Sequence, residues 1–120
     1  MNERAIAART RRAAGLEIDV AVDGRHLVVA LRGEVDTANA DGLPAVVLAA
    51  IRGDESVRID LSEVTFLDSA LLRSLLICQA RLAMQGTDVK VRNPTPQARR
   101  IFELTSLTSL LEDRAVLPCA

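Results

Sequence analysis

The two residues with the clearest potential for chemistry are Asp68 and Ser69, which stand directly before a long apolar stretch. That stretch predicts a helix, and a buried strand is predicted upstream, at residues 57–61. A side-chain oxygen at the start of a helix accepts hydrogen bonds from N–H groups that lack a partner within the helix. The same end of a helix favours an anion, such as the phosphate of a phosphorylated serine. The pair fits an ordinary helix cap or a phosphorylation switch, and spacing alone favours the cap.

Catalysis has little support in the sequence. The single histidine, His26, lies in an apolar segment, where a histidine is more often structural than catalytic. No set of nucleophile, base and orienting group can be assembled, no glycine-rich phosphate loop is present, and no Cys/His spacing indicates zinc. Four acidic residues could gather near strand ends and hold a cation weakly, but solvated loops and caps explain them more simply: Glu34, Asp36, Asp60 and Asp68. The sequence predicts a binding module that is not an enzyme and uses no cofactor and no metal.

Composition and charge exclude several other classes of protein. The chain has 120 residues, 49% of them hydrophobic, which suits one domain with an aliphatic core. Its 15 basic and 16 acidic residues give a net charge of -1, and Trp and Tyr are absent, so neither a basic patch nor a base-stacking platform for nucleic acid is expected. No apolar run approaches the roughly 20 residues that span a bilayer, and no secretory signal is present, so we expect a cytoplasmic protein without membrane insertion.

The two cysteines do not form a disulfide framework. Cys78 lies within a helical pattern and is expected to be a small buried apolar residue. Cys119 stands next to the C-terminus, and a redox pair between the two is the less favoured alternative.

The order of predicted elements indicates an α/β fold. Strands are expected at 16–23 and 26–35, joined as a hairpin by Asp23-Gly24, and further strands at 56–61 and 88–92. Helices are expected at 45–51, from Ser69 to about residue 85, and from Pro96. Strands that alternate with helices predict one sheet with helices packed against it. We expect a flexible basic tail at 1–15, one domain at 16–112 and a loose end at 113–120.

Three segments of the chain form a recognisable pattern: Gly33-Glu34-Val35-Asp36, the run from Asp60 to Ser69, and the run from Asn93 to Thr105. Together they resemble the STAS domain family, in particular the bacterial anti-sigma factor antagonists. Each is weak alone, but their order and spacing together are fairly specific. The resemblance implies a mixed sheet of four or five strands with helices on one face. It also implies binding to an anti-sigma factor of the serine kinase type, which frees a sigma factor for transcription.

The sequence departs from the family pattern at the residue that usually takes the phosphate. The family segment is commonly Asp-Ser-Ser/Thr-Gly, and its second hydroxyl residue is the acceptor. Here that position is Ala70, and the glycine is replaced by Leu71. Ser69 remains, but it is rotated by about 100° around the helix from position 70, so its phosphorylation is doubtful. The resemblance therefore implies an antagonist that lacks the usual switch, one that is switched at Ser69 or by another input, or a STAS module with a different partner.

The partner-binding surface implied by the resemblance combines a loop with the first turns of the second helix. Glu34, Asp36 and Thr37 are expected to line the loop, beside Asp68 and Ser69 at the helix start. The exposed first turns of that helix are expected to carry three more: Ala70, Leu71 and Arg73. An exposed edge strand would allow a homodimer. The alternatives are a STAS subunit of a membrane lipid-transport ABC complex that docks on an ATPase, another non-enzymatic STAS scaffold, and a nucleotide binder.

Overall fold

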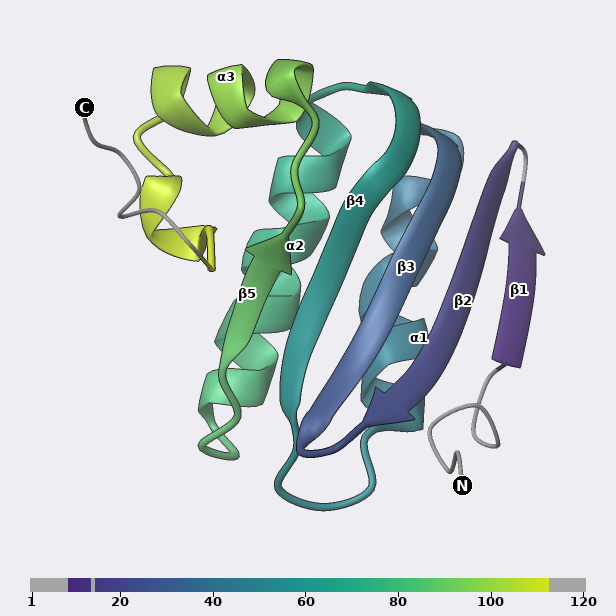
Figure 1. Cartoon of the computed structure of the whole chain (residues 1–120), viewed down its shortest axis with the longest axis vertical. Helices are drawn as coiled ribbons and strands as arrows, with labels where there is room; N and C mark the ends of the chain where they lie inside the picture. Colours follow the sequence, from purple (N-terminus) through teal and green to yellow (C-terminus); the bar gives the residue numbers. More distant parts are fainter. Residues whose placement is uncertain (1–8, 14, 113–120) are drawn as a thin grey trace.

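The computed structural model describes residues 9–13 and 15–112, and it confirms the predicted α/β fold. Five strands form one mixed sheet in the order β1-β2-β3-β4-β5 (Figure 1). The strands are β1 (Arg9–Ala13), β2 (Leu16–Asp23), β3 (His26–Val35), β4 (Ser56–Leu67) and β5 (Val89–Arg92). The helices are α1 (Leu43–Ala50), α2 (Ser69–Ala83) and α3 (Pro96–Leu104), with short 3-10 turns η2 (Ala40–Gly42) and η3 (Thr108–Leu110).

The pairing of the strands follows the sequence signals. β2 and β3 form the predicted antiparallel hairpin, in which Asp23 pairs with His26. Gly24, in the turn between them, has a φ of +65°. β3–β4 and β4–β5 are parallel, as expected where helices connect the strands. Parallel pairing of β3 with β4 brings their carboxyl ends to the same end of the sheet.

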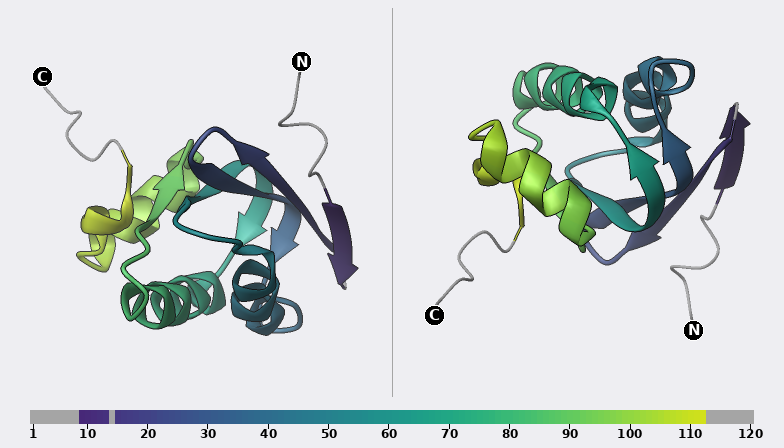
Figure 2. Two further views of the ribbon diagram at one scale, coloured as in Figure 1. Left: turned by 90° about the horizontal axis from the view of Figure 1, so that it is seen from below. Right: turned by 90° about the horizontal axis from the view of Figure 1, so that it is seen from above.

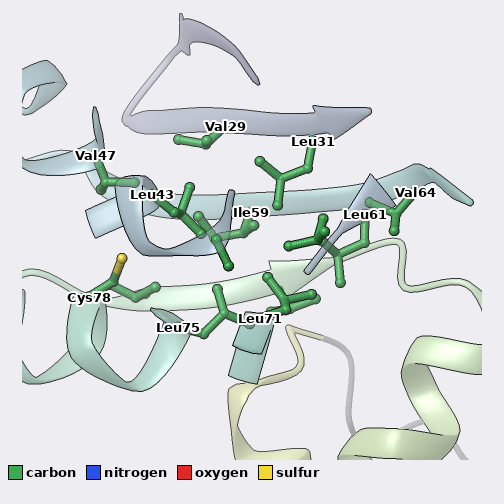
Figure 3. Packing of buried hydrophobic residues seen from close by; sticks show 14 of the residues in the cluster. Val29, Leu31, Leu43, Val47, Ile59, Leu61, Val64, Leu71, Leu75 and Cys78 are labelled. Carbon is green, nitrogen blue, oxygen red and sulfur yellow. The ribbon is translucent and has the colours of Figure 1, made fainter. Parts of the chain in front are cut away.

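The core lies between the sheet and two helices. α1 and α2 lie side by side on one face of the sheet, while α3 lies beyond the ends of the strands (Figures 1 and 2). Alternate side chains of the central strands point into this layer and meet residues of α1 and α2, among them Val29, Leu31, Ile59 and Leu61 (Figure 3). Cys78 is fully buried there, as predicted, and burial raises the pKa of its thiol to about 11. The thiol therefore stays protonated at neutral pH. Within the described residues, no helix combines the length and apolar character needed to cross a membrane.

Two strands differ from the sequence prediction. Arg9–Ala13, expected in a tail, form strand β1 because their backbone pairs antiparallel with the open edge of β2. β4 does not end at Leu61 but continues to Leu67. The alternation of buried and exposed residues breaks after Leu61, but irregularities in the β3–β4 register allow the two strands to stay paired. Residues 1–8 and 113–120, including Cys119, lie outside the described residues.

The buried stripe of α2 also differs from the predicted one. The apolar spacing predicted a stripe with Leu72, Leu75, Leu76, Ala80 and Ala83. Leu76, Ala80 and Ala83 are exposed, however, and the buried set is Ala70, Leu71, Leu72, Ser74, Leu75, Cys78 and Leu82. The helix carries apolar residues on two faces, so its sequence periodicity does not show which face meets the sheet.

An ion-pair cluster joins the last described residues to the sheet on the side away from α2. Glu112 accepts hydrogen bonds from Arg58 Nε and Arg92 Nε, each at 2.9 Å, and its N–H donates to the carbonyl of Val91 at 2.8 Å. Hydrogen bonds from Arg92 and Arg58, with their positive charges, lower the pKa of Glu112 to about 2. Glu112 thereby holds the chain after η3 against β5.

We expect Glu112→Gln to lower the free energy of unfolding at neutral pH by about 1 kcal/mol, a modest value because the side chain is partly solvated. The folded-state pKa lies below the ordinary 4.5. The carboxylate's stabilisation is therefore complete above about pH 5 and is lost as the pH falls towards 2. Urea unfolding at neutral and acid pH should show that the variant lacks this part of the pH dependence. Glu103→Gln is the matched control, because Glu103 is an exposed glutamate of α3. An equal loss of stability in that variant would contradict the role of the cluster.

Candidate functional site

The carboxyl ends of β3 and β4 bring two of the predicted motifs together. Val35 pairs with Leu67 in the parallel register, and Asp68 N–H donates to the carbonyl of Val35 at 3.2 Å. The loop that begins at Asp36 therefore starts beside the first turn of α2, as predicted.

Asp68 is the N-cap of α2. Its backbone is extended, and its Oδ1 accepts a hydrogen bond from the N–H of Ala70 at 2.8 Å. Asp68 thus has the structural role that spacing alone favoured. Ser69, the first residue of the helix, is exposed.

The loop after β3 is held in place by Asn39, a residue that the sequence analysis did not select. Asn39 Oδ1 accepts from the N–H of Asp36 at 3.0 Å, and its Nδ2 donates to the carbonyl of Glu34 at 2.9 Å. Asp36 Oδ1 in turn accepts from the N–H of Ala38 at 2.9 Å. These bonds fix the backbone around Thr37, whose side chain is exposed. The sequence signal was an Asn three residues after an Asp in a turn-rich segment, a pattern typical of side-chain-to-backbone bonding.

Ser74, in the second turn of α2, ties the same loop to the helix. Its hydroxyl donates to the carbonyl of Ala40 at 2.6 Å, and both residues are buried. The loop from Asp36 to Ala40 and the start of α2 therefore form one surface, which we call the loop–helix platform. Its exposed polar side chains are Thr37, Ser69 and Arg73, with half-buried Asp36 and Asp68, and exposed Glu34 adjoins it at the end of β3.

Two residues predicted on this surface are not there. Ala70 is 1% exposed and Leu71 is 0% exposed, so the expectation that both lie on exposed turns is wrong. Leu71 points into the core beside Leu75 and Ile59 (Figure 3). The reason is geometric, because α2 turns the second and third residues after its cap towards the sheet. Leu71 therefore fills core space and is not an added surface anchor.

The exposed aromatic Phe66 lies next to the platform and was also missed. It is 46% exposed and pairs with Glu34 in the β3–β4 register. The strand predicted to end at Leu61 does not include Phe66, which lies near the end of the longer β4. Exposed aromatic residues are common anchors in protein interfaces.

The platform is a surface of polar side chains around the start of a helix. No cluster of three or more His, Cys, Asp or Glu that could hold a metal ion occurs among the described residues. His26 stands at the opposite end of β3 from the platform, about 30 Å away at the usual rise of a strand. What the site offers is shape, exposed polar side chains and the N-terminus of a helix.

Comparison with known proteins agrees with this geometry. The profile of a family described as "Mlab, STAS domain" matches residues 18–112. A Bordetella bronchiseptica protein, BtrV, provisionally named an anti-sigma factor antagonist, is 30% identical over 90 residues, which are 74% of this chain and 77% of that protein. The anti-sigma-B factor antagonist of Bacillus subtilis is 24% identical over 97 residues, covering 81% of this chain and 89% of its own.

A solved structure gives the same result. The crystal structure of an anti-sigma factor antagonist from Mycobacterium paratuberculosis superposes with a TM-score of 0.71 and 28% identity, covering 84% of this chain and 88% of that one. The resemblance noted in the sequence is therefore confirmed at the level of family and fold.

Proposed function

This chain belongs to the STAS domain family, and on that premise we propose that it is an anti-sigma factor antagonist without the usual phosphorylation switch. In this function the loop–helix platform binds an anti-sigma factor of the serine kinase type, and the captured factor releases its sigma factor for transcription. The protein acts by binding, without enzymatic activity. The observation that carries the proposal is the fixed loop after β3, on which Thr37 is exposed, held beside the exposed start of α2 at Ser69.

The first support for a missing switch is chemical. Position 70, where the family resemblance places the acceptor hydroxyl, is an alanine and cannot carry a phosphate ester. The position is also buried beneath the platform, with its N–H engaged by Asp68. A phosphate, with a charge of about -1.5 to -2, would have to enter a region that excludes water.

The remaining hydroxyl, Ser69, is exposed and lies in the first turn of α2. A phosphate there would meet the positive end of the helix and leave the fold intact. It would still add charge and bulk to the centre of the platform and so weaken a fitted interface. We propose that Ser69 contacts the partner and carries no stoichiometric phosphate in the cell.

Affinity capture of the full chain from its host, with identification of the bound protein, tests this function. We expect recovery of an anti-sigma factor of the kinase type, and at least about tenfold weaker recovery by Ser69→Asp and by Arg73→Glu. Arg52→Glu, an exposed charge reversal after α1, is the matched control and should capture as well as the wild type. Recovery of membrane-transport subunits alone would overturn the proposal, and stoichiometric phosphoserine at Ser69 by mass spectrometry would overturn the constitutive form of it.

One observation favours a second candidate, a STAS subunit of a lipid-transport ABC complex. The matching family profile carries the description "Mlab", and such a subunit needs no acceptor hydroxyl at position 70. The same capture experiment separates the two, because that function predicts a transporter ATPase as the bound protein.

A further inference from the structure

The outward face of α2 carries a second apolar seam. Four residues spaced by four, three and four are buried against the sheet: Leu71, Leu75, Cys78 and Leu82. Four others repeat the same spacing on the exposed face, and the last three of them are apolar: Arg73, Ile77, Ala80 and the C-cap residue Met84. This spacing is typical of helices that pack against another helix, so α2 has the pattern of a helix with partners on both sides.

Large apolar side chains on this face are open to solvent. Met84 is 87% exposed, Leu76 40% and Ile77 38%. Three of the five exposed large hydrophobic residues among the described residues thus lie on the outward side of α2 and its C-cap residue. An apolar patch with such an alignment is typical of a surface that another protein covers. We call it the outer stripe: Arg73, Leu76, Ile77, Ala80, Arg81 and Met84.

The charge of the outer stripe is entirely positive. α2 contains no acidic residue, and neighbouring α1 contains no charged residue at all. Arg73 and Arg81 are exposed, and among the described residues neither has an ion-pair partner. They stand eight residues apart, which is about 12 Å along the helix axis and about 80° around it. Leu76, Ile77 and Ala80 therefore lie between two solvated guanidinium groups along the helix, and Met84 follows one turn after Arg81.

This arrangement selects among occupants. Two copies of this chain that met through the outer stripe by a two-fold axis would bring arginine against arginine. Antiparallel helices would juxtapose Arg73 with Arg81, and parallel helices would juxtapose each with itself. Like charges held together oppose association, whereas carboxylates at the same places favour it.

We propose that the outer stripe is the docking surface for an amphipathic helix of another protein. The apolar face of that helix packs on Ile77, Ala80 and Met84. Its flanks carry carboxylates about two turns apart that meet Arg73 and Arg81. The proposal goes beyond the loop–helix platform, since the stripe continues 11 residues past Arg73 and shares only that residue with it.

Two helical peptides of about 18 residues, held helical by lactam bridges, test the proposal. Both carry leucines at spacings of four, three and four. One has glutamates on its flanks two turns apart, and the other has lysines in their place. Each is titrated with the full chain, and binding is followed by fluorescence anisotropy. We expect the acidic peptide to bind at least about tenfold more tightly than the basic one.

Variants outside the platform locate the binding. Met84→Ser and Arg81→Glu should each weaken the acidic peptide at least about fivefold. Leu104→Ser, which removes a 70%-exposed leucine from α3, is the matched control and should leave binding unchanged. Equal affinity for both peptides, or no effect of either variant, would overturn the proposal.

Two further measurements keep the outcome unambiguous. A dimer in sedimentation that Met84→Ser abolishes would name a second copy as the occupant and overturn the proposal. Ser69→Asp, which lies on the platform, should leave peptide binding intact. A variant that loses partner capture but keeps the peptide would therefore separate failure of the platform from failure of the outer stripe.

Discussion

Replacing Ala70 by aspartate is expected to destabilise the fold by about 3 kcal/mol at neutral pH. An uncompensated buried charge costs about 3–5 kcal/mol, and the N-terminus of α2 offsets only about 0.3–1 kcal/mol of it. The change is large because Ala70 is 1% exposed, although it lies in the first turn of a helix. Urea unfolding followed by circular dichroism measures the loss.

Ser69→Asp is the matched control, since it places the same carboxylate one residue earlier on an exposed position. Its effect on stability should lie within about 0.5 kcal/mol of the wild type, because the helix N-terminus accepts a solvated anion. Burial raises the folded-state pKa of an aspartate at position 70 above its usual value. The deficit of the Ala70 variant should therefore shrink as the pH falls below that pKa. Equal stability of the two variants would mean that position 70 is open to solvent.

Gly33→Ala is expected to cost about 3 kcal/mol or more. Gly33 has φ +107°, a conformation that L side chains rarely adopt, and such backbone strain costs about 1–3 kcal/mol. A Cβ at this position would also overlap the carbonyl oxygen of Gly15, a backbone atom that cannot move aside without disturbing the start of β2. The backbone strain and the steric overlap both lower the free energy of unfolding, so a single added methyl group has a large effect here.

Gly24→Ala supplies the comparison for that variant. Gly24 also has a positive φ, +65°, but a Cβ there would meet nothing within 4 Å. Its substitution should cost about 1 kcal/mol, the strain without the overlap. The difference between the two variants in thermal or urea unfolding measures the close approach of Gly33 to Gly15, and equal losses would refute it. Partner capture should also weaken in Gly33→Ala, because the next residue, Glu34, adjoins the loop–helix platform.

The sequence predicted most of the fold because its local signals agree with one another. The Asp23-Gly24 turn, the Asp68 cap and Pro96 at the start of α3 each fix where an element begins or ends, whatever the core contains. The β1 strand could not be predicted in this way, because Arg9–Ala13 lack an apolar alternation and gain their conformation from backbone pairing with β2.

The platform was predicted in outline but not in detail. Parallel strands bring Asp36 and Asp68 together, and that followed from the order of elements. Which helix residues face outwards did not follow, because α2 has apolar residues on two faces. For the same reason Ala70 and Leu71 were expected at the surface. The roles of Asn39 and Ser74 could not be predicted, because both side chains donate to backbone carbonyls whose positions no sequence pattern specifies.

The bonds made by Asn39 have a consequence for the affinity and selectivity with which a partner binds. A loop that must first be ordered loses conformational entropy on binding, and that loss weakens the complex. Here the amide of Asn39 holds the turn before any encounter. The loop is therefore preorganised for a partner that fits its present conformation. A partner that requires another conformation of the loop must break the two hydrogen bonds of the Asn39 amide. Such a surface favours discrimination between related partners over adaptation to many.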